Sequence, residues 1–146
     1  MILPDVNVLL YAFRHDSTGH AEYRRWLEDT INGETAYGIA PQTLASLVRI
    51  STHPGIYLHP SQLREALGFC QALLQPSQCT VVQPGPRHWE IFAGLCRTAR
   101  ATGNLVQDAW FAALAIEWGC EWISTDRDYA RFPGLRWREP FAVSGL

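Results

Sequence analysis

The chain has 146 residues, of which 47% are hydrophobic and 18% charged, and its formal net charge is −2. A sequence of this length and apolar content folds as one domain and is too hydrophobic to be disordered. Its longest apolar run spans only residues 109–116, whereas roughly 20 residues are needed to cross a bilayer. No basic segment precedes the apolar N-terminus, as a secretory signal would require. We therefore expect a single domain over residues 1–146 that is soluble, cytoplasmic and not associated with a membrane.

The basic residues and the cysteines limit which anion, metal and redox sites the chain could form. All 12 basic residues are arginine, so any contact with an anion would use a planar guanidinium fork. A slightly acidic chain has no general attraction for polyanions, and nucleic-acid binding would need a local arginine patch or a metal. The four cysteines match no zinc or redox spacing, which suits a reducing compartment.

Short apolar runs alternate along the chain with longer helical patterns. Strands are expected at residues 2–5, 35–40, 79–82, 121–124 and 135–138. Between them we expect helices at 6–14, about 20–31, 41–51, from 60 to about 74, about 87–102 and 104–118. Strands that alternate with helices pair in parallel through right-handed crossovers. The sequence therefore predicts an α/β fold, a three-layer α/β/α sandwich with a mainly parallel sheet of four to five strands.

Two acidic residues follow strands of this expected sheet. Asp5 ends the first strand and Asp126 follows the fourth. In open parallel sheets ligands bind beyond the carboxyl ends of the strands. Each residue also has a purely structural interpretation, because aspartate caps helices and stabilises turns.

Asp108 is the third acidic residue of interest. We expect it in the first turn of a helix that is apolar nearly all round, with Asn104 as the N-cap. A carboxylate there could simply favour the positive end of the helix dipole. A mostly buried acid nevertheless needs a partner, and the chain has no lysine.

The expected topology brings Asp5, Asp108 and Asp126 to one edge of the sheet. Carboxylates that lie close together raise one another's pKa unless a cation neutralises them. Oxygen ligands alone favour Mg²⁺ or Mn²⁺ over zinc. Such a site suits hydrolysis of a phosphodiester, because the metal activates water and stabilises charge on the phosphate.

Three segments resemble the motifs of PIN-domain proteins. They are LPDVNVLLYA at 3–12, GNLVQDA at 103–109 followed by AALA at 112–115, and STDRDY at 124–129 followed by Phe132. Their order and spacing agree over almost the whole chain, and the strongest likeness is to VapC-type toxins of bacterial toxin–antitoxin pairs. The resemblance implies a PIN-like fold and a Mg²⁺- or Mn²⁺-dependent endoribonuclease with an RNA substrate, a cognate antitoxin partner and a homodimeric state.

The resemblance also assigns residue roles. Asp5, Asp108 and Asp126 would be the catalytic metal ligands, with Asp128 as a possible additional acid. Three polar residues would support these ligands rather than bind metal: Asn7, Thr125 and Ser46.

One departure concerns the helix after the second strand, where family members usually carry a glutamate. Ser46 stands there instead, and no acid occurs between Glu34 and Glu65. Glu34 precedes the second strand and should face the opposite edge of the sheet. The missing glutamate puts a strict two-metal mechanism in doubt.

Other functions remain open at this point. The missing glutamate would also suit a catalytically silent PIN module that binds RNA or protein. A phosphatase could use Asp5 as a nucleophile, but such enzymes generally have a second aspartate two residues on, where Asn7 stands. A purely structural protein is disfavoured because unpaired acids at one edge cost stability.

Two sets of residues are expected to contact partners, and a third is expected in the core. The helices between residues 21 and 48 have apolar faces that an antitoxin helix could occupy. Trp26, Trp89 and Trp110 lie in apolar patterns and are expected in the core. Arginines near the acidic residues either hold RNA phosphates or are simply solvated: Arg49, Arg97, Arg100, Arg127 and Arg131.

Overall fold

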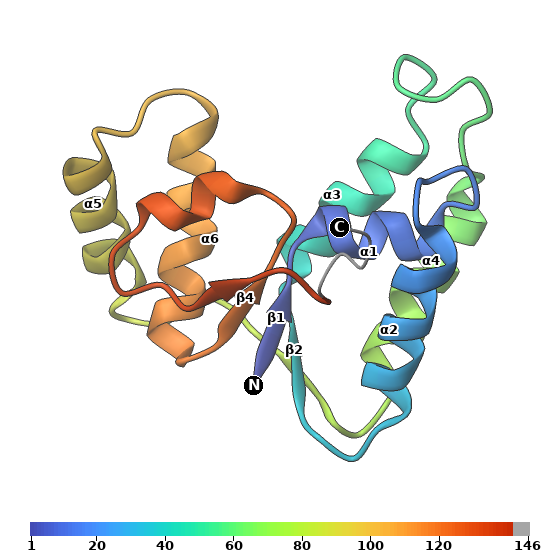
Figure 1. Cartoon of the computed structure of the whole chain (residues 1–146), viewed down its shortest axis with the longest axis horizontal. Coiled ribbons are helices and arrows are strands. Elements are labelled where there is room, and N and C mark those ends of the chain that lie inside the picture. Colours follow the sequence, from blue (N-terminus) through green and yellow to red (C-terminus); the bar gives the residue numbers. More distant parts are fainter. Residues whose placement is uncertain (142–146) are drawn as a thin grey trace, which may run out of the picture.

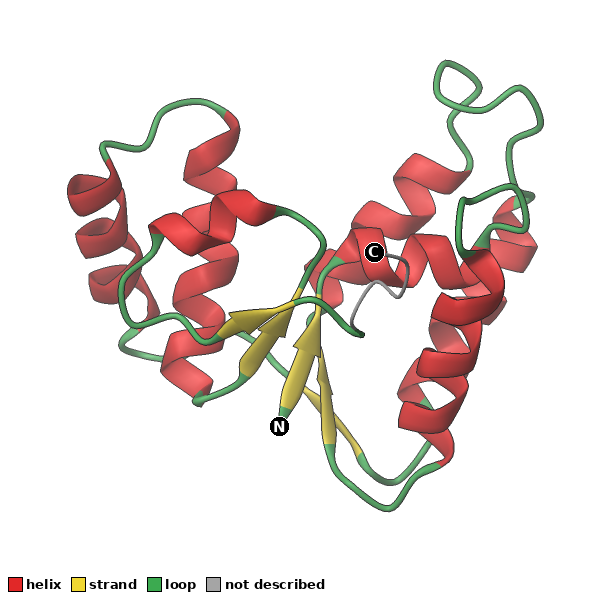
Figure 2. Ribbon diagram, viewed as in Figure 1, coloured by secondary structure: helices red, strands yellow, loops and turns green. Residues whose placement is uncertain are grey.

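The computed structural model describes residues 1–141, so the last five residues of the expected domain lie outside the described part. A five-stranded sheet in the order β3-β2-β1-β4-β5 forms its centre (Figure 2). All neighbouring strands pair in parallel. The strands are β1 (Ile2–Pro4), β2 (Tyr37–Ile39), β3 (Cys79–Val81), β4 (Glu121–Ile123) and β5 (Trp137–Arg138).

Helices cover both faces of this sheet, which confirms the three-layer α/β/α sandwich (Figure 1). On one face lie α5 (His88–Ala99), α6 (Asn104–Trp118) and the short 3-10 helix η1 (Arg127–Arg131). On the other face lie α1 (Val6–Phe13), α2 (His20–Asn32), α3 (Pro41–Ser51) and α4 (Leu63–Leu74). Each crossover returns the chain to the amino-terminal edge, so every strand ends at the same carboxyl edge.

Two apolar cores, one on each face, stabilise the short strands. Side chains alternate along a strand, and Leu3 and Trp122 pack on the α6 side while Tyr37 and Ile39 pack on the side of α1 to α4. All four are at most 1% exposed. Full burial of such a side chain contributes roughly 1.5–3 kcal/mol, so packing rather than strand length holds the sheet together.

Three local expectations are wrong. Helix α4 begins at Leu63 and not at residue 60. Gly103, with φ 60° and ψ −132°, is the N-cap of α6 in place of Asn104, so Asp108 lies beyond the first turn. Trp89 is 73% exposed, whereas Trp26 and Trp110 are half-buried. The residues of α5 that are buried are His88 and Leu95, and Trp89 lies about 100° around the helix from His88.

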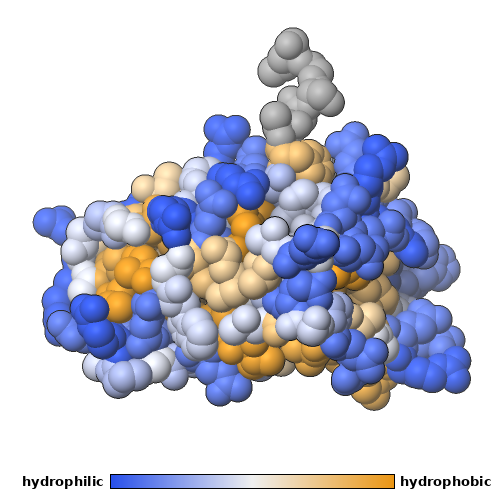
Figure 3. Space-filling view, turned by 90° about the horizontal axis from the view of Figure 1, so that it is seen from below, coloured by the Kyte–Doolittle hydropathy of each residue, from blue (hydrophilic) through white to orange (hydrophobic). Residues whose placement is uncertain are grey.

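The amino-terminal edge of the sheet faces the viewer in Figure 3, where hydrophilic side chains surround smaller apolar patches. Glu34 lies in the loop that leads into β2, and therefore at this edge. A hollow of about 440 Å³ opens here beside Met1, Trp26 and Tyr37. Among residues 1–141 no helix is both long and apolar enough to cross a membrane.

Candidate metal centre

Asp5 is held by the backbone at the carboxyl end of β1. Its N–H donates to the carbonyl of Ile123 at 2.8 Å, which extends the pairing between β1 and β4 by one residue. Its Oδ1 accepts a hydrogen bond from the Val6 N–H at 2.7 Å, so Asp5 is the N-cap of α1. The side chain is only 7% exposed. Asp5 therefore does have the structural role of a cap, and that role fixes one carboxylate oxygen while the other points toward β4.

Ser124 connects Asp5 to the end of β4. The register pairs Pro4 with Ile123, which places the next residues, Asp5 and Ser124, side by side. The fully buried Ser124 hydroxyl donates to Asp5 Oδ2 at 2.7 Å. It accepts from Asn7 Nδ2 at 3.2 Å and from the Asp126 N–H at 3.0 Å. The sequence analysis missed Ser124, although its position directly after a strand that neighbours β1 was a usable signal.

The three supporting residues expected from the sequence differ in what they contact. Asn7 Nδ2 also donates to Asp5 Oδ2, at 3.4 Å. Thr125 takes part through its backbone, since its N–H donates to Asn7 Oδ1 at 3.5 Å. Ser46 is half-buried on α3. Within the described part of the chain, neither the Thr125 hydroxyl nor the Ser46 hydroxyl bonds to a site carboxylate.

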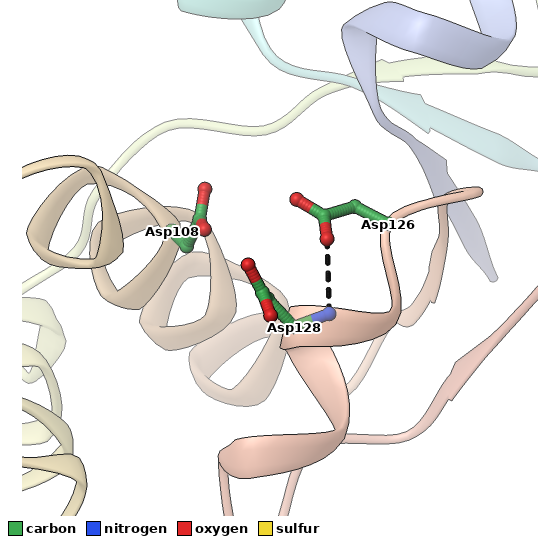
Figure 4. Close-up of side chains that lie close together, drawn as sticks. All are labelled: Asp108, Asp126 and Asp128. Carbon is green, nitrogen blue, oxygen red and sulfur yellow. Dashed lines mark hydrogen bonds between the residues drawn. The ribbon is translucent and has the colours of Figure 1, made fainter.

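Three other carboxylates form a tight group. Asp108, Asp126 and Asp128 each offer an oxygen, and these oxygens lie within 4.8 Å of one another. Asp126 is the N-cap of η1, because its Oδ1 accepts from the Asp128 N–H at 2.9 Å. This short turn brings the carboxylates of Asp126 and Asp128 together opposite Asp108 of α6, as Figure 4 shows.

The charges of the site are poorly compensated. Burial raises the pKa of Asp5 to about 6, against the opposing hydrogen bonds from Ser124 and Val6, and the charges of Asp108 and Asp126 add to the increase. The pKa of Asp108 is also raised, first by burial and then by Asp126 and Asp128. Asp5 is also linked to Asp126 through the Ser124 hydroxyl, although it is not one of the three clustered residues.

Cations of the protein itself do little to balance this charge. Within residues 1–141 the four acids make one ion pair, between Asp128 and Arg131 at 4.0 Å, and both side chains are exposed. Exposed ion pairs of this kind contribute little to the free energy of folding. Each ligand atom that these acids offer to a metal is a carboxylate oxygen, which suits Mg²⁺ or Mn²⁺ better than zinc. The residues therefore fit a hard divalent cation.

Tyr129 is a second residue of the site that the sequence analysis did not identify. Its side chain is 3% exposed, and its hydroxyl donates to Asp108 Oδ1 at 3.3 Å. Burial and the neighbouring carboxylates raise the pKa of Tyr129. The phenol therefore remains a protonated hydrogen-bond donor at neutral pH.

The arginines considered for RNA contacts are all on the surface. None of the five is buried, and Asp128 is exposed as well, so the acidic group is open to a large substrate on this side. The five are Arg49, Arg97, Arg100, Arg127 and Arg131.

Known proteins are similar in sequence to this chain over nearly its whole length. A family model described as "PIN domain" matches residues 2–135. "VapC ribonuclease Mb2897" of Mycobacterium bovis is 39% identical over 140 residues, which cover 96% of this chain and 95% of that protein. "Ribonuclease VapC33" of Mycobacterium tuberculosis is 35% identical over 143 residues, covering 96% of this chain and 98% of the relative.

Two solved structures share the fold. VapBC2 from Rickettsia felis, bound to a DNA fragment from its promoter, has a TM-score of 0.70 at 17% identity and covers 95% of this chain and 98% of that chain. FitAcB from Neisseria gonorrhoeae has a TM-score of 0.64 at 16% identity, with coverage of 96% and 98%. The family model and the sequence relatives agree with this likeness of fold, and the chain belongs to the PIN-domain family, among its VapC ribonucleases.

Proposed function

We propose that this protein is a Mg²⁺- or Mn²⁺-dependent endoribonuclease that acts as the toxin of a toxin–antitoxin pair. The observation that carries the proposal is the group formed by Asp108, Asp126 and Asp128 within 4.8 Å of one another. The buried Asp5 lies beside this group, and nearly all of this charge is uncompensated. The names of the sequence relatives, VapC ribonucleases, support RNA as the substrate.

The four acids have different roles in this proposal. Asp5, Asp108 and Asp126 are the catalytic metal ligands, and Asp128 is the additional acid. A bound Mg²⁺ or Mn²⁺ would activate a water for attack on phosphorus and stabilise the leaving oxygen. Ser124 and Asn7 hold Asp5 Oδ2 in place through their hydrogen bonds. Asp128 supplies a carboxylate to a site whose α3 carries Ser46 in place of an acid.

The exposed arginines hold RNA phosphates in this proposal. Arg127 and Arg131 belong to η1, the same short helix that carries Asp128, and are the nearest to the acids along the chain. A guanidinium fork binds phosphate through two N–H groups. Single-stranded loops are the usual targets in RNA, because their bases and backbone are accessible.

A groove between α1, α2 and α4 is the site we propose for an antitoxin helix. It has a volume of about 330 Å³, and its apolar lining includes Phe13, Leu27 and Phe69. The solved structures that share the fold are named as VapBC2 and FitAcB. Helix-in-groove binding buries such a surface. The exposed Ala72 lines the groove, so Ala72→Arg is expected to prevent co-purification with the antitoxin while RNA cleavage is unchanged.

We also propose a homodimer in the cytoplasm. Trp89 is 73% exposed and its ring lies 5.4 Å from that of the half-buried Phe92, and this aromatic pair is the contact we propose between the two copies. Light scattering would show a dimer that Trp89→Ser converts to a monomer. The four cysteines are free thiols, as is usual in the reducing cytoplasm.

The decisive experiment compares wild type with Asp108→Asn, purified without antitoxin, on total cellular RNA. Each protein is incubated with Mg²⁺, Mn²⁺ or chelator, and the cleaved ends are mapped. Discrete cuts are expected only from wild type with metal. Asp29→Asn, an exposed acid of α2, is the matched control and should cleave like wild type.

Two results would support other functions. Well-folded wild type that cuts no RNA with either metal would favour a silent module that binds RNA or protein. A phosphorylated Asp5 would favour a phosphatase. The phosphatase is disfavoured because Asn7 stands where such enzymes generally have a second aspartate.

A further inference from the structure

The hydroxyl of Tyr129 is not explained by packing. The ring lies 5.3 Å from that of Trp122 and 6.1 Å from that of Phe132, measured between centroids. Phenylalanine would fill the same apolar space. Within residues 1–141 the hydroxyl makes one hydrogen bond, to Asp108 Oδ1. Because a buried hydroxyl needs a partner, the contact with Asp108 is the feature that the tyrosine adds at this position.

The same contact is equally important for Asp108. Its neighbours on α6 are largely apolar, and Ala109 and Phe111 to Ala115 are buried. Among the described residues no other group donates a hydrogen bond to the Asp108 carboxylate, and no cation pairs with it. The Tyr129 hydroxyl occupies Oδ1 and leaves Oδ2 available. Without this bond no hydrogen bond from the described residues would hold the carboxylate toward Asp126 and Asp128.

We propose that Tyr129 is a positioning residue that orients Asp108 toward Asp126 and the cation that these two carboxylates would share. This inference rests on the proposed function, because it takes these carboxylates as metal ligands. At 3% exposure the Tyr129 side chain does not reach the substrate, so its effect is exerted through Asp108. Groups that hydrogen-bond to metal ligands typically alter metal affinity by about 10- to 100-fold.

The length of the hydrogen bond between Tyr129 and Asp108 predicts which property changes when the bond is lost. At 3.3 Å it is longer than the usual O–H···O hydrogen bond, so it stabilises the metal-free fold only weakly. Its loss should therefore change metal binding more than the free energy of unfolding. This separation distinguishes a positioning role from a merely structural one.

The test compares Tyr129→Phe with Tyr37→Phe by calorimetric titration of Mn²⁺ alone. Tyr37 is a matched control, because it is 1% exposed and its hydroxyl also donates a hydrogen bond, to the Leu73 carbonyl at 2.7 Å, away from the acids. Tyr129→Phe is expected to weaken Mn²⁺ binding roughly 10-fold. Tyr37→Phe should bind Mn²⁺ as wild type does.

RNA cleavage provides a second measurement on the same proteins. For Tyr129→Phe, the Mn²⁺ concentration that gives half-maximal cleavage should rise about 10-fold, while kcat at saturating Mn²⁺ stays within roughly twofold of wild type. Equal Mn²⁺ affinity in Tyr129→Phe and wild type would overturn the inference and leave the ribonuclease proposal standing. A kcat that excess Mn²⁺ does not restore would overturn it too. Wild type that binds no Mn²⁺ would overturn both proposals.

Discussion

The two halves of the candidate site are built in opposite ways. At the β1–β4 side, Asp5 is 7% exposed and its two oxygens accept hydrogen bonds from Val6, Ser124 and Asn7. At the α6–η1 side, Asp128 is exposed, and the clustered carboxylates have one long bond from Tyr129, one backbone bond and one exposed ion pair. The first half is positioned by the backbone ladder, whereas the second depends on a few weak contacts.

This difference indicates how the site is organised for binding. Backbone register fixes Asp5 whether or not a cation is bound, and burial keeps its pKa high. The other three acids repel one another in the absence of a cation. We therefore expect the α6–η1 half to become ordered by the cation and the β1–β4 half to be ready beforehand.

The largest expected effect is the loss of cleavage in Asp5→Asn. A rigid, buried ligand should contribute about 4 kcal/mol to the transition state, or about a 1,000-fold loss in rate. The exposed Asp128 should matter less, with a loss of roughly 10-fold in Asp128→Asn. Single-turnover cleavage at saturating Mn²⁺ measures both. Equal losses would contradict the division into a rigid and a loose half.

Stability should depend on pH through Asp5. The pKa of Asp5 is raised from 3.8 to about 6 in the fold, so the folded state binds more protons than the unfolded state between these values. The contribution to stability is present below pH 4 and is lost as pH rises to about 6, by at most about 3 kcal/mol. Urea unfolding in chelator at pH 4.5 and pH 7 measures it. Asp5→Asn, which does not titrate, should lack this part of the pH dependence.

Ser124→Ala should destabilise the β1–β4 half. It removes a buried hydrogen bond to Asp5, leaves the Asp126 N–H without its acceptor and removes one of the two hydrogen bonds that Asn7 Nδ2 donates. We expect a loss of about 2 kcal/mol in the free energy of unfolding. Ser46→Ala is the control and should change it by less than about 0.5 kcal/mol. A similar loss of unfolding free energy in both variants would contradict the role of Ser124 as the link between β1 and β4.

The smallest effect is expected from Asp108→Asn without metal. Replacing a half-buried carboxylate that two acids repel should stabilise the metal-free protein, while asparagine can still accept the Tyr129 bond. Solvent screens this charge, so the gain should be about 1 kcal/mol, or roughly 3 °C in melting temperature. Thermal unfolding in chelator measures it. Addition of Mn²⁺ should then stabilise wild type alone, and a lower melting temperature for Asp108→Asn in chelator would contradict the proposed repulsion.

Most of the fold was predictable from local patterns. The alternation of apolar runs with helical periods predicted a mainly parallel sheet of four to five strands and the helices between them, because burial on both faces of a sheet requires that pattern. The errors lie at helix ends and on one helix face. Both Gly103 and Asn104 are acceptable caps by composition, and only the positive φ of Gly103 decides between them. Trp89 belongs to an apolar pattern, yet α5 buries His88 and Leu95 and leaves Trp89 exposed.

The sequence by itself placed Asp5, Asp108 and Asp126 at one edge of a parallel sheet, because strand ends and motif spacing lead there. The tertiary structure groups Asp108 and Asp126 with Asp128, which the sequence offered only as an additional acid, and keeps Asp5 at the end of β1 as the N-cap of α1. The contacts of Ser124 and Tyr129 were decided only by the tertiary structure. Ser124 bonds to a residue 119 positions away, and Tyr129 to one 21 positions away. These bonds depend on strand register and on how η1 packs against α6, to a fraction of an ångström. Periodicity reports which face a residue occupies, whereas a hydrogen bond also requires the distance and direction that packing sets.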